Sequence, residues 1–102
     1  MSLVNIDSVQ RQVIQMLARI ETPAGIELSS YKRNRSIAVA VLPDNKYLVR
    51  EDGYVEQELE IKKSGLAKML KTMIKREFPR SRKVRVHKFS HPGELDRLRK
   101  RL

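Results

Sequence analysis

Residues 36–61 read SIAVAVLPDNKYLVREDGYVEQELEI, and this stretch decides the fold. It contains runs of β-branched and alternating residues, separated by the turn-forming sequences Pro43-Asp44-Asn45 and Glu51-Asp52-Gly53. These connections are too short for a crossover, so neighbouring strands must run antiparallel. Together with a further strand-like segment at residues 26–31, the stretch predicts a meander whose other strands lie at residues 36–42, 46–50 and 54–61.

Two of these strands differ in their burial pattern. Residues 37–42 are apolar at every position, which predicts a central strand covered on both faces. Residues 54–61 alternate instead, so one face should be wet and acidic while the other is buried. The expected inner residues are Val55, Leu59 and Ile61, and the expected outer residues are Tyr54, Glu56, Glu58 and Glu60.

Two amphipathic helices flank the meander. The first is predicted over residues 7–20, opened by a capping box of Asp7 and Gln10 and ended by Thr22-Pro23. The second is predicted over residues 64–78, capped by Ser64 and ended at Phe78-Pro79. Their apolar faces are Val9, Val13, Met16, Leu17 and Ile20 in the first helix, and Leu66, Met69, Leu70, Met73 and Ile74 in the second.

A strand at residues 84–87 and a short C-terminal helix complete the expected α+β fold. The helix follows His91-Pro92-Gly93, and Leu95, Leu98 and Leu102 repeat along it at helical spacing. The predicted order is α-β-β-β-β-α-β-α. We expect a sheet of four to five strands with the two amphipathic helices packed on one face and the short helix at an edge.

Length and composition narrow the class of protein. The 102 residues suit a single α+β domain spanning 1–102, in which residues 1–3 are interpreted as a candidate vector-derived leader. The absence of Cys excludes disulfides and thiolate metal sites and favours a reducing compartment. The longest apolar run, residues 37–42, is far below the roughly 20 residues of a membrane span. We therefore expect a soluble, cytoplasmic protein with no membrane partner.

The charge is divided unevenly along the chain. Residues 1–61 carry seven Lys/Arg against nine Asp/Glu, a net of −2, whereas residues 62–102 carry fifteen against three, a net of +12. Like charges at this density repel one another, and an anionic partner would turn that cost into attraction. The sequence therefore predicts a nucleic-acid-binding protein with a basic face that contacts phosphates. The candidate binding residues are Lys62, Lys63, Lys68, Lys71, Lys75, Arg80, Arg82, Lys83 and Arg85.

The kind of nucleic acid stays open, with RNA slightly favoured over DNA. A helix, antiparallel strands and a second helix opened by Lys62, Lys63 and Lys68 resemble the double-stranded RNA-binding domain. The resemblance implies that these lysines contact phosphates. The order equally resembles the saddle-shaped repeat of TATA-binding proteins, so element order fixes no family. Base stacking is weakly indicated, because most of the aromatic residues look structural. The aromatic residues are Tyr31, Tyr47, Tyr54, Phe78 and Phe89.

A second interpretation is an enzyme. Pro43-Asp44 followed by Glu60 and Lys62 resembles the PD-(D/E)xK signature of Mg²⁺-dependent nucleases, in which two carboxylates hold the ion. Asp44 is also the residue that a turn favours, and Glu60 also continues a solvated acidic strand face. We therefore expect no catalytic activity and no metal site. Isolated glycines form no phosphate loop or dinucleotide motif, so no cofactor is expected either.

A third interpretation is a protein-interaction or assembly module. The acidic strand face and the basic helix could pair head to tail between copies, or the basic surface could bind an acidic protein. His87 and His91 are four residues apart, but Pro92 keeps them off one helix, so they are not expected to bind a metal. Nucleic-acid binding, assembly and nuclease activity thus remain three alternatives, in that order.

Overall fold

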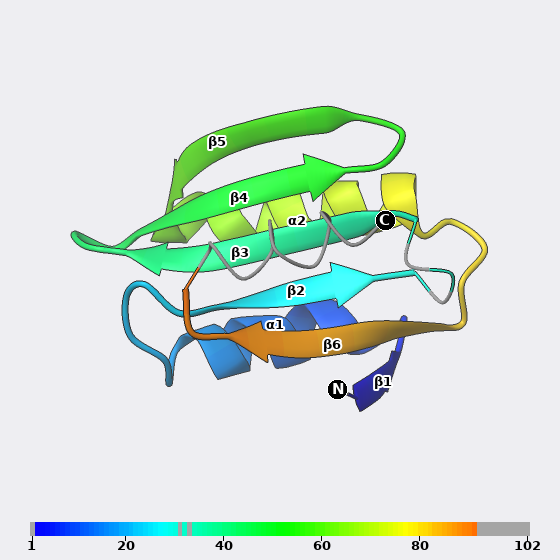
Figure 1. Cartoon of the computed structure of the whole chain (residues 1–102), viewed down its shortest axis with the longest axis horizontal. Helices are drawn as coiled ribbons and strands as arrows, with labels where there is room; N and C mark the ends of the chain where they lie inside the picture. Colours follow the sequence, from blue (N-terminus) through cyan, green and yellow to red (C-terminus); the bar gives the residue numbers. More distant parts are fainter. Residues whose placement is uncertain (1, 31, 33, 92–102) are drawn as a thin grey trace.

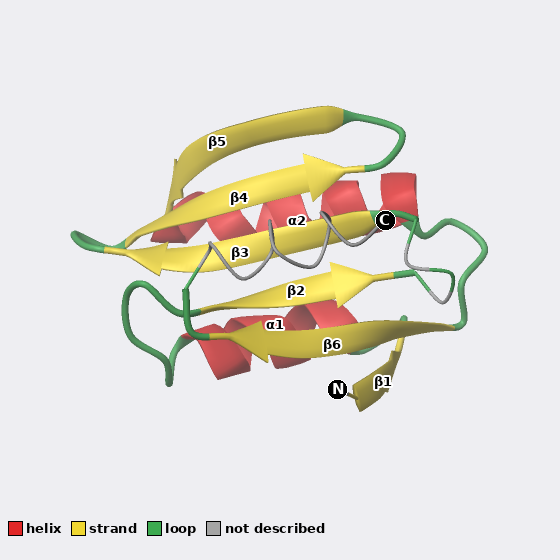
Figure 2. Cartoon of the chain, viewed as in Figure 1, coloured by secondary structure: helices red, strands yellow, loops and turns green. Residues whose placement is uncertain are grey.

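The described residues form a six-stranded antiparallel sheet with both helices packed against one face (Figures 1 and 2). The computed structural model describes residues 2–30, 32 and 34–91. The strand order is β1-β6-β2-β3-β4-β5. The elements are β1 (Ser2–Asn5), α1 (Val9–Leu17), β2 (Gly25–Ser29), β3 (Ser36–Leu42), β4 (Lys46–Asp52), β5 (Glu56–Lys62), α2 (Lys63–Glu77) and β6 (Lys83–Phe89).

The predicted α+β class and the central meander are confirmed. β2, β3, β4 and β5 lie side by side in chain order, joined by short connections. At the β3–β4 turn, Asp44 and Asn45 have φ angles of 64° and 58°, a left-handed conformation that short Asx side chains tolerate. The turn chemistry read from the sequence therefore closes this hairpin.

The sheet has one strand more than expected. β6 returns to pair with β2, and β1 adds outside it with Val4 opposite Val84. β1 has only four residues, too few for alternation to reveal it. The predicted strand 54–61 begins later, at Glu56, because residues 53–55 form the β4–β5 loop. The expected C-terminal helix after His91 lies outside the described residues.

Helix α1 buries the predicted apolar face but begins differently. Val9, Val13 and Leu17 are buried against the sheet, whereas the capping box of Asp7 and Gln10 is wrong. Ser8 occupies the N-cap without a side-chain cap bond, and Gln10 Nε2 instead donates to the carbonyl of Ala67 in α2 at 2.5 Å. Gln10 thus joins the two helices rather than closing the first turn of its own helix.

Helix α2 starts at Lys63, directly after β5, so the predicted Ser64 cap is also wrong. The extended Lys62 is the N-cap, and the amide of Lys63 donates to Asn45 O of the β3–β4 turn at 2.9 Å. A backbone carbonyl thereby replaces the expected side chain as partner of an N-terminal amide. The helix ends where predicted, before Pro79. None of the described helices has the length and apolar content that a bilayer-spanning helix requires.

The central strand β3 is covered on both faces, as predicted. Ile37 and Val39 pack with the helices in the main core. Ala38 and Ala40 belong to a second buried cluster with Phe89 and the partly buried Leu48, on the opposite face. Gly25 of β2 pairs with both Ala40 and Phe89, and the Phe89 ring occupies the space where a Cβ at residue 25 would lie.

Gly25→Ala should destabilise the fold. The new methyl group would overlap Val39 O and the Phe89 ring and would lie 2.8 Å from Ala40 Cα, and the backbone atoms cannot move independently of the sheet. We expect the free energy of unfolding in urea to fall by about 1–3 kcal/mol.

Gly65→Ala is the matched control. Its Cβ would meet the flexible tip of Ile61 at 3.1 Å, and alanine is favoured over glycine inside a helix. This variant should stay within about 1 kcal/mol of the wild type. Equal stability of both variants would show that Phe89 does not pack on Gly25 as described.

Candidate nucleic-acid interface

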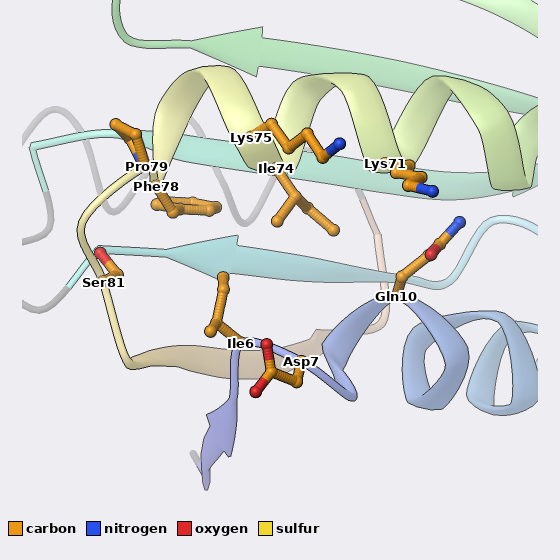
Figure 3. Close-up of a pocket in the computed structure, with 9 residues that line it drawn as sticks. All are labelled: Ile6, Asp7, Gln10, Lys71, Ile74, Lys75, Phe78, Pro79 and Ser81. Carbon is orange, nitrogen blue, oxygen red and sulfur yellow. The ribbon is translucent and has the colours of Figure 1, made fainter.

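A groove of about 520 Å³ lies between the start of α1 and the end of α2 (Figure 3). Its size falls within the roughly 300–1,000 Å³ of typical ligand sites. Ile74 and Phe78 supply an apolar floor, while Lys71 and Lys75 on α2 and Gln10 on α1 carry polar ends around it. Its lining residues are Ile6, Asp7, Gln10, Lys71, Ile74, Lys75, Phe78, Pro79 and Ser81.

Helical spacing explains why α2 supplies both the floor and the rim. Lys71, Ile74, Lys75 and Phe78 follow one another at steps of three, one and three residues, which places them along one side of the helix. Ile74 and Phe78 are buried in the core, whereas the two lysines are exposed. The groove therefore combines an apolar base with two cations at its edge.

Backbone and side-chain hydrogen bonds hold the walls of the groove. The Gln10 bond to Ala67 O fixes α1 against α2, and the amide of Ile6 donates to Arg82 O at 2.8 Å. The amide of Ser81 donates to Phe78 O at 3.3 Å, which turns the chain after α2. These contacts connect β1, α1, α2 and the following loop around a single site.

The lysines of α2 have no anionic partner in the described part of the chain. Lys68, Lys71 and Lys75 are exposed and take part in no ion pair there. Arg80 and Arg82, in the loop that follows, are exposed as well. Asp7 is the carboxylate among the lining residues. The rim is thus predominantly positive, and its like charges repel unless an anion binds.

The structure separates the nine predicted binding residues into three groups. The first group follows α2 and the loop after it, and of its members Lys71 and Lys75 line the groove; the group is Lys68, Lys71, Lys75, Arg80 and Arg82. Lys62 and Lys63 lie at the other end of α2, with Lys46 around a shallow depression at the β3–β4 turn. Twelve helical residues separate Lys63 from Lys75, about 18 Å.

Lys83 and Arg85 form the third group, on the opposite side of the sheet. Their neighbours Val84 and Val86 are buried in the core beneath the helices. Side chains alternate along a strand, so Lys83 and Arg85 point to the face without helices. These nine residues therefore do not form the single continuous basic face that the sequence suggested.

The three residues of the nuclease-like signature do not converge. Asp44 and Lys62 both line the depression at the β3–β4 turn, but Glu60 is not among its lining residues. Glu60 is exposed on β5, opposite Leu48. Within the described residues, no group of three His, Asp or Glu side chains is arranged to hold a metal ion.

The helix-free face of the sheet has charges of opposite sign at its two sides. Glu56, Glu58 and Glu60 are exposed on β5 as predicted, and Glu58 accepts a hydrogen bond from Arg50 Nε at 2.9 Å. His87 is half-buried on β6, where Glu27 is its cross-strand neighbour. The basic β6 and the acidic β5 are separated by the apolar cluster around Ala38 and Ala40.

A buried cluster of charged residues at the end of α2 was missed by the sequence analysis. Glu51 and Glu77 are 1% and 0% exposed. Glu51 accepts hydrogen bonds from Arg76 Nε at 2.8 Å and Nη2 at 2.6 Å, and from Gln57 Nε2 at 2.8 Å. The available signal was an acid at an inward position of β4, in alternation with Tyr47 and Val49.

Glu77 fastens the β4–β5 loop to the helix. Its carboxyl oxygens accept hydrogen bonds from the amides of Tyr54 at 2.9 Å and Val55 at 3.3 Å. Arg35 Nε donates to Glu77 O at 2.7 Å, which satisfies a carbonyl at the helix C-terminus. Gly53 passes so close that any Cβ would overlap the Glu77 carboxyl group. The loop is therefore held by several contacts at once.

The two buried carboxyl groups have pKa values shifted in opposite directions. Burial would raise the pKa of Glu51, but hydrogen bonds from Arg76, Glu77 and Gln57 outweigh it and lower that pKa to about 2. Burial and the hydrogen bond with Glu51 raise the pKa of Glu77. The hydrogen bonds from the amides of Tyr54 and Val55 lower that pKa, but by less, so the net shift is upward. The pKa values of the two carboxyl groups are therefore driven apart, with that of Glu77 the higher.

No protein-family model, curated protein or solved structure matches the chain. The resemblance to the double-stranded RNA-binding domain therefore remains one of element order. Four strands lie between the two helices here, and β1 and β6 extend the sheet beyond them.

Glu77→Gln should change how stability depends on pH. The contribution of wild-type Glu77 is fully present below its unfolded pKa, near 4.5, and is lost as the pH rises through the raised folded pKa. Glutamine does not ionise, so the wild type should lose stability relative to this variant as the pH rises above 4.5. Urea denaturation across that range measures the difference.

Glu51→Gln should change the pH dependence of stability in the opposite direction. The contribution of Glu51 is present above pH 4.5 and is lost as the pH falls toward about 2. The wild type should therefore lose its advantage over this variant on the acid side. Two differences that stay constant with pH would contradict the opposite directions of the two pKa shifts.

Proposed function

We propose that the protein binds nucleic acid without catalysing a reaction, and that backbone phosphates contact Lys68, Lys71 and Lys75 beside the groove. The observation that carries this proposal is that these exposed lysines follow one helix and have no anionic partner within the described residues. Their repulsion costs a few tenths of a kcal/mol per pair, and a polyanion would reverse its sign.

The distribution of ion pairs supports the same interpretation. Arg50 and Arg76 are paired with Glu58 and Glu51, so arginines beside acidic residues are already neutralised. Lys71 and Lys75 lie on the groove side of the helix, toward α1. A surface that served only solubility would be expected to intersperse the two signs.

Arg80 and Arg82 are suited to extend the phosphate contacts around the end of α2. Both are exposed, and the backbone of Arg82 is anchored by the amide of Ile6. The cations at Lys62, Lys63, Lys83 and Arg85 lie elsewhere and would act mainly through the long-range field, which raises the rate of encounter with a polyanion. The preference for RNA rests on element order alone, and the cytoplasm is the compartment we assign.

The second candidate is an assembly module, favoured by the charge separation on the helix-free face. The acidic strand β5 of one copy could face the basic strand β6 of another, a heterologous contact that propagates. An acidic protein could also occupy the basic surface. Oligomerisation in the absence of nucleic acid would favour this candidate over the first.

Replacing Lys68, Lys71 and Lys75 together with Gln should weaken nucleic-acid binding strongly. If each lysine contacts one phosphate, the slope of log affinity against log salt should fall by about two to three units. The fold should remain intact, and relief of repulsion should leave it equally or slightly more stable. Fluorescence anisotropy with labelled RNA and DNA at several salt concentrations measures both quantities.

A control variant removes the same charge elsewhere. Arg11→Gln, Arg19→Gln and Lys88→Gln alter three exposed cations that do not line the groove. This variant should change the salt slope much less than the α2 variant. Equal loss in both variants would mean that net charge, rather than the α2 stripe, attracts the nucleic acid.

A further inference from the structure

Tyr54 is an aromatic ring left exposed on a well-held loop. It is 68% exposed, whereas Tyr47, Phe78 and Phe89 are buried in the core. Large exposed apolar side chains among the described residues are limited to Tyr54 and Leu3. An exposed ring on a binding surface is a candidate contact rather than a packing residue.

The surroundings of Tyr54 fix its position before any ligand binds. Its amide is bound by the buried Glu77 carboxyl group, and Gly53 packs directly on that group. The Arg35 guanidinium lies 4.9 Å from the centre of the Tyr54 ring, and its Nε is bound to Glu77 O. Little conformational entropy therefore remains to be lost when a ligand contacts the ring.

One face of the ring is covered by Arg35, and the rest of the ring is largely exposed to solvent. Aromatic rings of this kind stack on nucleic-acid bases, each of which has a π-face, and a cation on the far side adds to the attraction for a polyanion. Such stacking needs a base that is not already stacked within a duplex.

We propose that Tyr54 is a stacking platform for an unpaired base, and hence that the ligand is single-stranded nucleic acid. This inference rests on the proposed function and specifies its ligand. The groove and Tyr54 lie on opposite flanks of the last turn of α2, because Lys75 and Phe78 face the groove while Glu77 holds the β4–β5 loop.

The two sites lie at the same end of the molecule. Figure 1 shows the β4–β5 loop, the end of α2 and the loop leading to β6 at the same end of the molecule. Arg80, exposed just after α2, lies on this end. A helix is about 10–12 Å across, so a strand of a few nucleotides can reach from the lysines to Tyr54.

Tyr54→Trp places a fluorescent reporter at the platform, because the chain contains no tryptophan of its own. We expect the fluorescence of this variant to be quenched by an oligouridine or oligothymidine strand. Inorganic polyphosphate, which carries the charges without bases, should bind but leave the emission unchanged. A duplex of equal length should quench little.

Two further variants separate stacking from charge. Tyr54→Phe keeps the ring and should bind the single strand within about twofold of the wild type. Tyr54→Ala should weaken binding by about 5- to 100-fold, the range expected for loss of one stacked base. The salt slope should stay unchanged, because no phosphate contact is removed. Urea denaturation checks that both variants are folded.

The outcomes distinguish this inference from the function on which it rests. If single strands and duplexes bind equally and the emission of the Tyr54→Trp variant never responds, the platform is overturned while nucleic-acid binding stands. If no strand binds at low salt, the proposed function fails and the platform with it. Loss of binding in Tyr54→Ala together with a reduced salt slope would also overturn stacking as the role of the ring.

Discussion

The hydrogen-bonded pair of buried carboxyl groups, Glu51 and Glu77, determines how the end of α2 sits on the sheet. Through Arg76 the pair joins the last turn of the helix to β4, and through the amides of Tyr54 and Val55 it joins the same turn to the β4–β5 loop. A buried charge without partners would cost several kcal/mol, so the loss of either partner would destabilise the end of the helix. Their geometry places the lysine groove on one flank of the helix and the exposed Tyr54 on the other.

The uneven charge of the chain follows the same division. Of the acidic residues, Glu51 and Glu58 pair with arginines on or near the sheet, and Glu77 is shielded inside the fold. Lys68, Lys71 and Lys75 are left on the outer side of α2 and form no ion pair in the described structure, although Asp7 shares the groove with Lys71 and Lys75. The fold therefore neutralises some of its arginines internally and leaves these lysines exposed, where their field is open to an anion.

Most of the fold could be predicted from the sequence, because short turns force an antiparallel meander and apolar periodicity identifies both helices. The partner of β6 and the short β1 could not be predicted, since pairing across the sheet depends on distant residues. Of the nine residues that line the groove, Lys71 and Lys75 were among the predicted binding residues. The stripe on α2 follows from helical spacing, but the side of the sheet to which Lys83 and Arg85 point depends on where the helices pack. Glu51 and Glu77 escaped prediction because a buried carboxyl group is tolerated only through partners 25 or so residues away.

Charge and stacking would have different roles in the proposed interface. A field from clustered cations attracts any polyanion, duplex or single strand, and carries no information about exposed bases. Discrimination requires a contact of fixed orientation, and Tyr54 is held in such an orientation by Glu77 and Arg35. Affinity would then come chiefly from the lysines of α2, and selectivity for unpaired bases from the β4–β5 loop. Because Phe78 lines the groove and the adjacent Glu77 binds the loop, one turn of helix connects the two, and a change at that turn would alter affinity and selectivity together.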